Sequence, residues 1–134
     1  MVALVIVGIT SSITVGKIHQ LMIQNRIQRA ATTVRNDLEA AFALAVRNRR
    51  PIHVTWNSAT QQMYVSSRDG LTTFRKTNLG IGSFGLRTKD VAFSRSTLEV
   101  YPDGLANDTL TITIRRSGNI KLVRTSRSGL VVVQ

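Results

Sequence analysis

Few side chains in this sequence are spaced for catalysis. The two histidines, His19 and His53, have no Asp, Glu or Cys at the spacing of a metal site, so we interpret them as surface or packed residues. Asp37 and Glu39 lie two residues apart in a helical pattern and point to different faces, which excludes an acid–base pair. No serine stands in a nucleophile-elbow setting. We therefore predict no catalytic residue, no metal ligand and no enzymatic activity.

One glycine-rich segment, Gly80–Gly85, matches the pattern G-x-G-x-x-G. A dinucleotide site needs this pattern to leave a strand and to open a helix. Here it is followed by Leu86–Asp90, which has no helical pattern, and then by the strand-like Val91-Ala92-Phe93. A flexible loop is therefore favoured, and we predict no cofactor and no cofactor-binding residue. The sequence has no cysteine, which excludes disulfides, cysteine-ligated zinc and thiol catalysis.

The charge of the chain is strongly positive and unevenly placed. The 134 residues, about one domain, include 18 Lys and Arg against 7 Asp and Glu, a net charge of +11. Residues 1–50 have a net charge of +5, residues 51–108 of +1 and residues 109–134 of +5. Such an excess is typical of proteins that meet an anionic surface, such as nucleic acid or lipid headgroups. A solvated surface without a specific partner is the alternative.

The N-terminal segment is apolar and uncharged as far as Gly16. It lacks the basic start and the small-residue cleavage site of a signal peptide. A full membrane span needs about 20 apolar residues, and Thr and Ser dilute the second half of this segment. We therefore expect a short or truncated membrane helix over residues 1–20, with a buried core helix as the alternative. The candidate residues for membrane insertion and filament assembly are its aliphatic ones: Val2, Leu4, Val5, Ile6, Val7, Ile9 and Ile13.

The pattern then becomes amphipathic. Apolar residues recur at steps of three and four, and Phe42 widens the stripe. Arg35 and Glu39 have the i,i+4 spacing of a helical ion pair, and Pro51 forbids continuation of the helix. One helix is thus predicted from near Met1 to about Arg49, roughly 70 Å long. Its predicted core face consists of Ile23, Ile27, Ala30, Val34, Leu38, Ala41 and Ala45.

After the proline the apolar period changes to two, which predicts strands. The fold class is therefore α+β, with one long helix packed on a small antiparallel sheet. We expect a globular domain over residues 21–134, with Trp56 in its core and a loop over residues 77–90. The expected strands cover residues 52–56, 62–66, 70–75, 91–93, 98–101, 109–114, 120–125 and 130–133.

The hairpin near the C-terminus has two possible registers. A two-residue loop, Ser117-Gly118, would set Ile114 opposite Lys121 and mix a charge into an apolar face. A three-residue loop over 117–119 sets Ile114 opposite Leu122, so we expect this second register.

The expected register brings Arg115 opposite Lys121 on an exposed outer face and puts Arg124 on the apolar side, where the strand should end or bulge. Five basic residues and no acid lie between Thr109 and Gln134. The candidate DNA contacts are these five: Arg115, Arg116, Lys121, Arg124 and Arg127.

The apolar start, MVALVIVGITSSITVGKI, resembles the interior of the signature helix of type IV pilins and pseudopilins. That family normally begins Gly-Phe-Thr-Leu-Ile-Glu just before such a run. Because this beginning is absent from the sequence, Met1 is expected to lie inside the usual mature chain, without the prepilin leader. Val15-Gly16 stands where the family commonly has Val-Pro.

Further segments resemble the GspH/FimT branch of this family. They are Arg29–Thr32, Leu38–Arg47, Pro51–Val54, Trp56, Val100–Gly104, Ile120 and Ser128-Gly129. The FimT branch is associated with DNA uptake through a C-terminal Gly-Arg-x-Arg motif. The nearest segment here, Gly129-Leu130-Val131-Val132, has apolar residues in both arginine places.

The resemblance implies a structural subunit of a type IV pilus or of a type II secretion pseudopilus. Its partners would be other pilin or pseudopilin subunits and the inner membrane, which it would cross once with the globular domain on the periplasmic side. The alternative function is a minor pilin whose basic C-terminal region binds DNA weakly and without sequence specificity.

Overall fold

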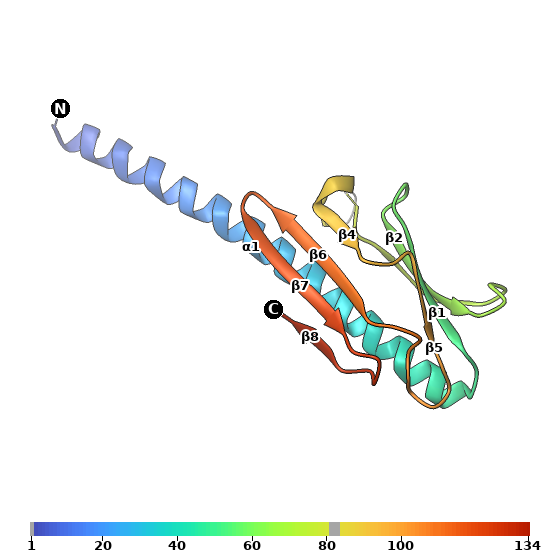
Figure 1. Cartoon of the computed structure of the whole chain (residues 1–134). Helices are drawn as coiled ribbons and strands as arrows, with labels where there is room; N and C mark the ends of the chain where they lie inside the picture. The colour runs from blue at the N-terminus through green and yellow to red at the C-terminus, as the bar shows by residue number, and fades with distance from the viewer. Residues whose placement is uncertain (1, 81–83) are drawn as a thin grey trace.

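The computed structural model describes residues 2–80 and 84–134, with side chains from Leu21 onward (Figure 1). It consists of one long helix followed by eight short strands, as the change of period predicts. The elements are α1 (Val2–Asn48), β1 (Ile52–Asn57), β2 (Gln62–Ser67), β3 (Thr73–Asn78), a 3₁₀ turn η1 (Thr88–Asp90), β4 (Val91–Phe93), β5 (Thr97–Val100), β6 (Leu110–Arg116), β7 (Asn119–Thr125) and β8 (Val131–Val133).

The helix ends where the sequence predicts. Arg47 lies in its last turn, where a positive charge suits the carbonyl end of the helix dipole. Arg49 adopts a φ of 52°, the left-handed conformation that commonly terminates a helix. Pro51 then cannot continue the helical hydrogen bonds. The predicted i,i+4 pair also forms, with 3.1 Å between Arg35 Nε and Glu39 Oε1.

The strands form two four-stranded antiparallel sheets. The first, here called the β1 sheet, has the order β3-β2-β1-β5, and the second, the β6 sheet, has the order β4-β6-β7-β8. The third strand starts at Thr73 rather than at the expected Gly70, because Gly70 belongs to the preceding turn with a φ of 76°. The globular part of α1 packs against both sheets, chiefly through β1, β6, β7 and β8 (Figure 1).

The core is built on the predicted stripe of α1. All seven predicted positions from Ile23 to Ala45 are buried, and so are Phe42 and Ala31. Alternate residues of the strands complete the core, as a period of two requires. They include Ile52 and Val54 of β1 and Ile112 and Ile114 of β6.

An aromatic pair connects the two sheets. Trp56 of β1 stacks on Phe93 of β4, with ring centroids 4.3 Å apart and planes 7° from parallel. Both side chains are partly exposed and pack against the core. Trp56 therefore packs against the edge of the core, whereas the sequence analysis expects it inside the core.

The predicted register of the last hairpin is wrong. Ile114 pairs with Lys121, Thr113 with Leu122 and Arg115 with Ile120, across the two-residue turn Ser117-Gly118. Both turn residues have positive φ, 51° and 82°, which is the geometry of a type I′ turn that matches the twist of the strands.

The observed register is tolerated because Lys121 lies at the margin of the core. It lines a groove of about 450 Å³ together with the polar residues Gln24, Asn25 and Gln28 of α1. A lysine can cover apolar neighbours with its stem while its ammonium group stays among polar groups and water. The charge on the apolar face, which argued against this register, is therefore accommodated.

Candidate functional site

The first candidate surface is the N-terminal part of α1. Figure 1 shows this part of the helix extending beyond both sheets. Of the side chains that the structure describes, Ile23 is the first along the helix that is buried, whereas Leu21 and Met22 are 56% and 50% exposed. The N-terminal part of the helix therefore lies beyond the chain's own sheets.

The candidate assembly residues are on this extended part. Their backbone is helical, and their side chains lie outside the described part of the structure: Val2, Leu4, Val5, Ile6, Val7, Ile9 and Ile13. Within the part of the chain that was described, no helical window is both long and apolar enough to cross a membrane.

The second candidate surface, the five basic C-terminal residues, is divided by the fold. Arg115 and Arg124 are exposed on the outer face of the β6 sheet, opposite to α1. The expectation that Arg124 falls on the apolar side is therefore wrong, because the two-residue turn moves β7 by one position. Lys121 lies on the helix side instead of facing Arg115.

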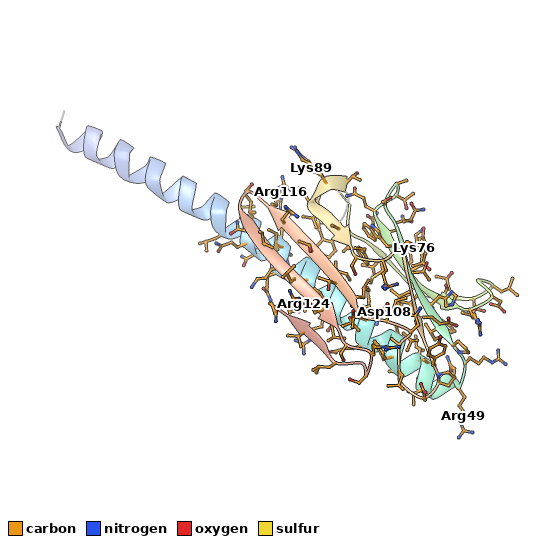
Figure 2. All side chains as sticks on the ribbon, in the orientation of Figure 1. Arg49, Lys76, Lys89, Asp108, Arg116 and Arg124 are labelled. Atoms are coloured by element: carbon orange, nitrogen blue, oxygen red, sulfur yellow. The ribbon has the colours of Figure 1, made fainter. Side chains whose placement is uncertain are left out.

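The two remaining candidates are engaged with backbone carbonyls. Arg116 donates a hydrogen bond from Nη1 to the carbonyl of Gly85. Arg127, in the loop before β8, donates from Nη2 to the carbonyl of Asn107 at 3.2 Å. The five residues thus do not share one face, and only Arg115 and Arg124 project together (Arg124 in Figure 2).

The structure also brings together basic residues that sequence reasoning missed. A Cβ atom placed on Gly85 would lie 3.2 Å from Nη1 of Arg26 and 3.5 Å from Nη1 of Arg116, so two guanidinium groups converge there. Lys89 of η1 lines a cavity of about 480 Å³ with Arg115 and Arg116. Arg26 and Lys89 are 63 positions apart in the sequence, and no local pattern relates them.

Most carboxylates form ion pairs or hydrogen bonds within the domain. Asp37 is buried on α1, where its Oδ1 lies 3.2 Å from Nε of Arg75 and its Oδ2 accepts a hydrogen bond from Thr77. Glu99 pairs with Arg68 at 3.3 Å and with His53 at 3.6 Å.

Two exposed loop carboxylates are stabilised in their charged form. A hydrogen bond from Ser67, followed by one from the backbone of Leu71, lowers the pKa of Asp69 below 3.8. The backbone N–H of Thr109, together with the charges of Arg95 and Arg127, lowers the pKa of Asp108. Arg95 also forms an ion pair with Asp108.

The residues considered for chemistry lie apart. Asp37 and Glu39 are on opposite sides of α1, as predicted. The described part of the glycine-rich segment leads into a 3₁₀ turn of three residues and then into β4, and Ile81–Ser83 lie outside the described residues. Among the residues that the structure describes, no three His, Cys, Asp or Glu side chains are grouped to hold a metal ion.

The fold is that of minor pilins and pseudopilins. The type IV minor pilin FimU of Pseudomonas aeruginosa superposes with a TM-score of 0.66 at 17% identity, over 83% of this chain and 90% of FimU. A second crystal form of FimU gives a TM-score of 0.62 at 16% identity, over 80% of this chain and 91% of that one. The minor pseudopilin EpsH of the Vibrio cholerae type 2 secretion system gives 0.61 at 15% identity, over 81% of this chain and 96% of EpsH.

Neither a family model nor a curated protein matches the sequence. The similarity to solved structures extends over most of this chain and almost all of each neighbour. The resemblance that the apolar helix and the strand pattern indicate is therefore confirmed at the level of the fold.

Proposed function

We propose that this protein is a structural subunit of a type IV pilus or of a type II secretion pseudopilus, without catalytic activity. The observation that carries the proposal is the N-terminal part of α1, which extends beyond the globular domain and is uncharged as far as Gly16. Its fold, shared with FimU and EpsH, supports the same reading.

The proposed mechanism is a transfer of the apolar helix between two environments. Before assembly, residues 1–20 are embedded in the inner membrane and the globular domain lies on the periplasmic side. During assembly the same residues pack against the helices of neighbouring subunits in the filament core. Burial against helices replaces burial in lipid, so the change in apolar exposure is small. Within residues 1–20, the uncharged stretch to Gly16 would lie in the hydrocarbon, and Lys17, the first charged residue, would lie among the headgroups.

An incorporation assay tests this proposal. The epitope-tagged full chain is produced with the other subunits of a filament system, and sheared filaments are probed for the tag. We expect the chain in the filament fraction, and we expect Val7→Arg to remove it because a charge at this depth is costly in lipid and in a helix bundle. The matched control is Val46→Arg, at an exposed position of the globular part of the same helix. Filaments that exclude the unmodified chain would contradict the proposal.

A second candidate function, weak DNA binding, is favoured by one observation. Arg115 and Arg124 project from the same outer face of the β6 sheet, and no acidic residue lies on β6 or β7. Two to three phosphate contacts would make the logarithm of the binding constant fall with the logarithm of the salt concentration at a slope of about −2 to −3, since each contact contributes about −0.9 on duplex DNA. Binding would be visible at low salt and largely lost at physiological salt.

A gel shift with random duplexes across salt concentrations tests this second candidate. Arg115→Gln with Arg124→Gln should abolish the low-salt shift, whereas Arg47→Gln with Arg49→Gln, which removes the same charge from the far end of the domain, should keep it. Equal loss in both double variants would show that net charge alone binds DNA and that the outer face is no site.

A further inference from the structure

The end of the globular domain from which α1 extends carries a group of basic residues from four elements. Figure 2 shows Arg116 and Lys89 at this end, with Arg49 at the opposite end of the domain. Arg26 belongs to the turn of α1 that follows Ile23, the first buried side chain among those that the structure describes. We name the group the basic rim; it consists of Arg26, Lys89, Arg115, Arg116 and Lys121.

Among the residues that the structure describes, no side chain of the rim forms an ion pair with a carboxylate of the domain. Arg26 and Arg116 converge on Gly85 although both are cationic. Asp90, the acid that lines the adjoining cavity, is buried and accepts a hydrogen bond from the backbone N–H of Arg87 at 2.8 Å. Among the described residues, the arginines that form ion pairs with carboxylates all lie outside the rim. Like charges held this close are stabilised by an anion from outside the chain.

The position of the rim along α1 determines which anion it can meet. Arg26 is nine residues after Lys17, about 14 Å along the helix. The headgroup layer is roughly 5–8 Å thick on each side of the hydrocarbon core. If the uncharged stretch that ends at Gly16 is embedded, as the proposed function holds, the rim lies within about one Debye length, roughly 8 Å, of the lipid phosphates.

We propose that the basic rim binds the phosphates of anionic lipid headgroups and so holds the globular domain down on the membrane before assembly. The inference rests on the proposed membrane anchoring. The rim would give the domain a defined orientation on the membrane. Because the rim must release the lipid phosphates when the subunit leaves the membrane, that step costs electrostatic energy that rises with the anionic lipid content. Each basic residue near an anionic leaflet raises the association constant with the membrane about fivefold.

The test uses the full chain in vesicles, with a fluorophore on a single cysteine, since the sequence has none of its own. Thr88→Cys places the label beside Lys89, and Ser128→Cys places it far along the domain, next to Gly129, which lies against Phe42. Quenching by a headgroup-attached quencher is measured in phosphatidylcholine alone and with phosphatidylglycerol added. We expect phosphatidylglycerol to raise quenching at position 88 by roughly threefold or more and to leave position 128 unchanged.

Two triple variants distinguish an effect of the rim from an effect of the net charge of the chain. Arg26→Gln, Lys89→Gln and Lys121→Gln should remove the effect of phosphatidylglycerol at position 88. Arg47→Gln, Arg49→Gln and Arg50→Gln lower the net charge equally at the opposite end and should keep it. Equal behaviour of the two triple variants, or no effect of phosphatidylglycerol on the unmodified chain, would overturn the proposal.

Further arms identify the anion and separate this proposal from the anchoring. Inorganic phosphate that reverses the quenching more than chloride at equal ionic strength would assign the rim to soluble phosphate. Duplex DNA bound at physiological salt and lost only in the rim variant would assign it to DNA. Flotation with neutral vesicles reports the anchoring alone. If the chain floats with the vesicles but shows no headgroup contact, the proposal about the rim is overturned and the membrane anchoring stands. If the chain does not float with the vesicles, the membrane anchoring is overturned.

Discussion

The two halves of α1 follow different sequence rules although they form one continuous helix. From Ile23 to Ala45 the apolar residues keep to one face, and that face is buried by the chain's own strands. From Met1 to Gly16 the sequence is uncharged all round, and the helix extends past the sheets (Figure 1). An amphipathic helix can bury its single apolar face against one sheet, whereas a helix that is apolar on all sides must be buried by lipid or protein on all sides. The second half therefore packs in the fold, whereas the first half is the part to which we propose a role in assembly.

The largest expected effect comes from the packed half. Phe42→Ala should lower the free energy of unfolding by about 3–5 kcal/mol, because it opens a cavity between α1 and the β7–β8 loop. Phe42 is 8% exposed, and its ring lies against Gly129. Val46→Ala, at a position that is 52% exposed, should change the free energy by no more than about 0.5 kcal/mol. Denaturant titration measures both, and an unchanged midpoint for Phe42→Ala would show that this face of α1 carries little of the packing.

A smaller effect compares two carboxylates of the packed half. Asp37→Ala should cost about 2 kcal/mol, since it leaves the hydroxyl of Thr77 and the guanidinium of Arg75 without their buried partner. Glu39→Ala removes an exposed ion pair with Arg35 and should cost about 0.5 kcal/mol or less. Equal losses, measured by thermal or denaturant unfolding, would mean that the burial of Asp37 has no energetic consequence.

The acid dependence of stability should arise in the globular half, because the sequence has no Asp or Glu before Asp37. Asp69 and Asp108 have folded pKa values below 3.8. Their stabilisation is therefore present above the unfolded pKa and is lost as the pH falls through the folded pKa. Asp69→Asn with Asp108→Asn should make the free energy of unfolding less dependent on pH below about 4. A pH titration of the double variant that matches the unmodified chain would assign the acid sensitivity to other groups.

The smallest effect on stability is expected from removing the uncovered half. A chain without residues 1–20 should keep its free energy of unfolding within about 0.5 kcal/mol, because Ile23 is the first buried side chain among those that the structure describes. It should also stay in solution without detergent, whereas the full chain should need detergent. Full-length protein that is monodisperse without detergent would contradict the role assigned to the first half.

Local patterns predicted most of the fold. The stripe from Ile23 to Ala45 could be identified because a helix repeats every 3.6 residues, and β6 because Leu110, Ile112 and Ile114 alternate with threonines. Helix and strand periods are properties of neighbouring residues, so a single sequence carries them.

What could not be predicted depends on residues far apart in the chain. The hairpin register differs from the expected one because the groove beside Gln24 and Gln28 of α1 makes room for Lys121, almost a hundred positions later. The two sheets are joined by Trp56 and Phe93, from separate strands. The basic rim likewise exists only because the topology carries Lys89 to the end of the domain where Arg26 lies.

Photo-crosslinking in assembled filaments tests the central claim, that the first half of α1 serves assembly, most directly. A photoreactive residue replaces Ile9 in the full chain, which is produced with the other subunits of a filament system, and a second chain carries it at the exposed Val46. The account predicts that the residue at position 9 captures the N-terminal helix of a neighbouring subunit, identified by mass spectrometry, and that the residue at position 46 captures none. Filaments in which position 9 crosslinks to no other subunit would contradict it.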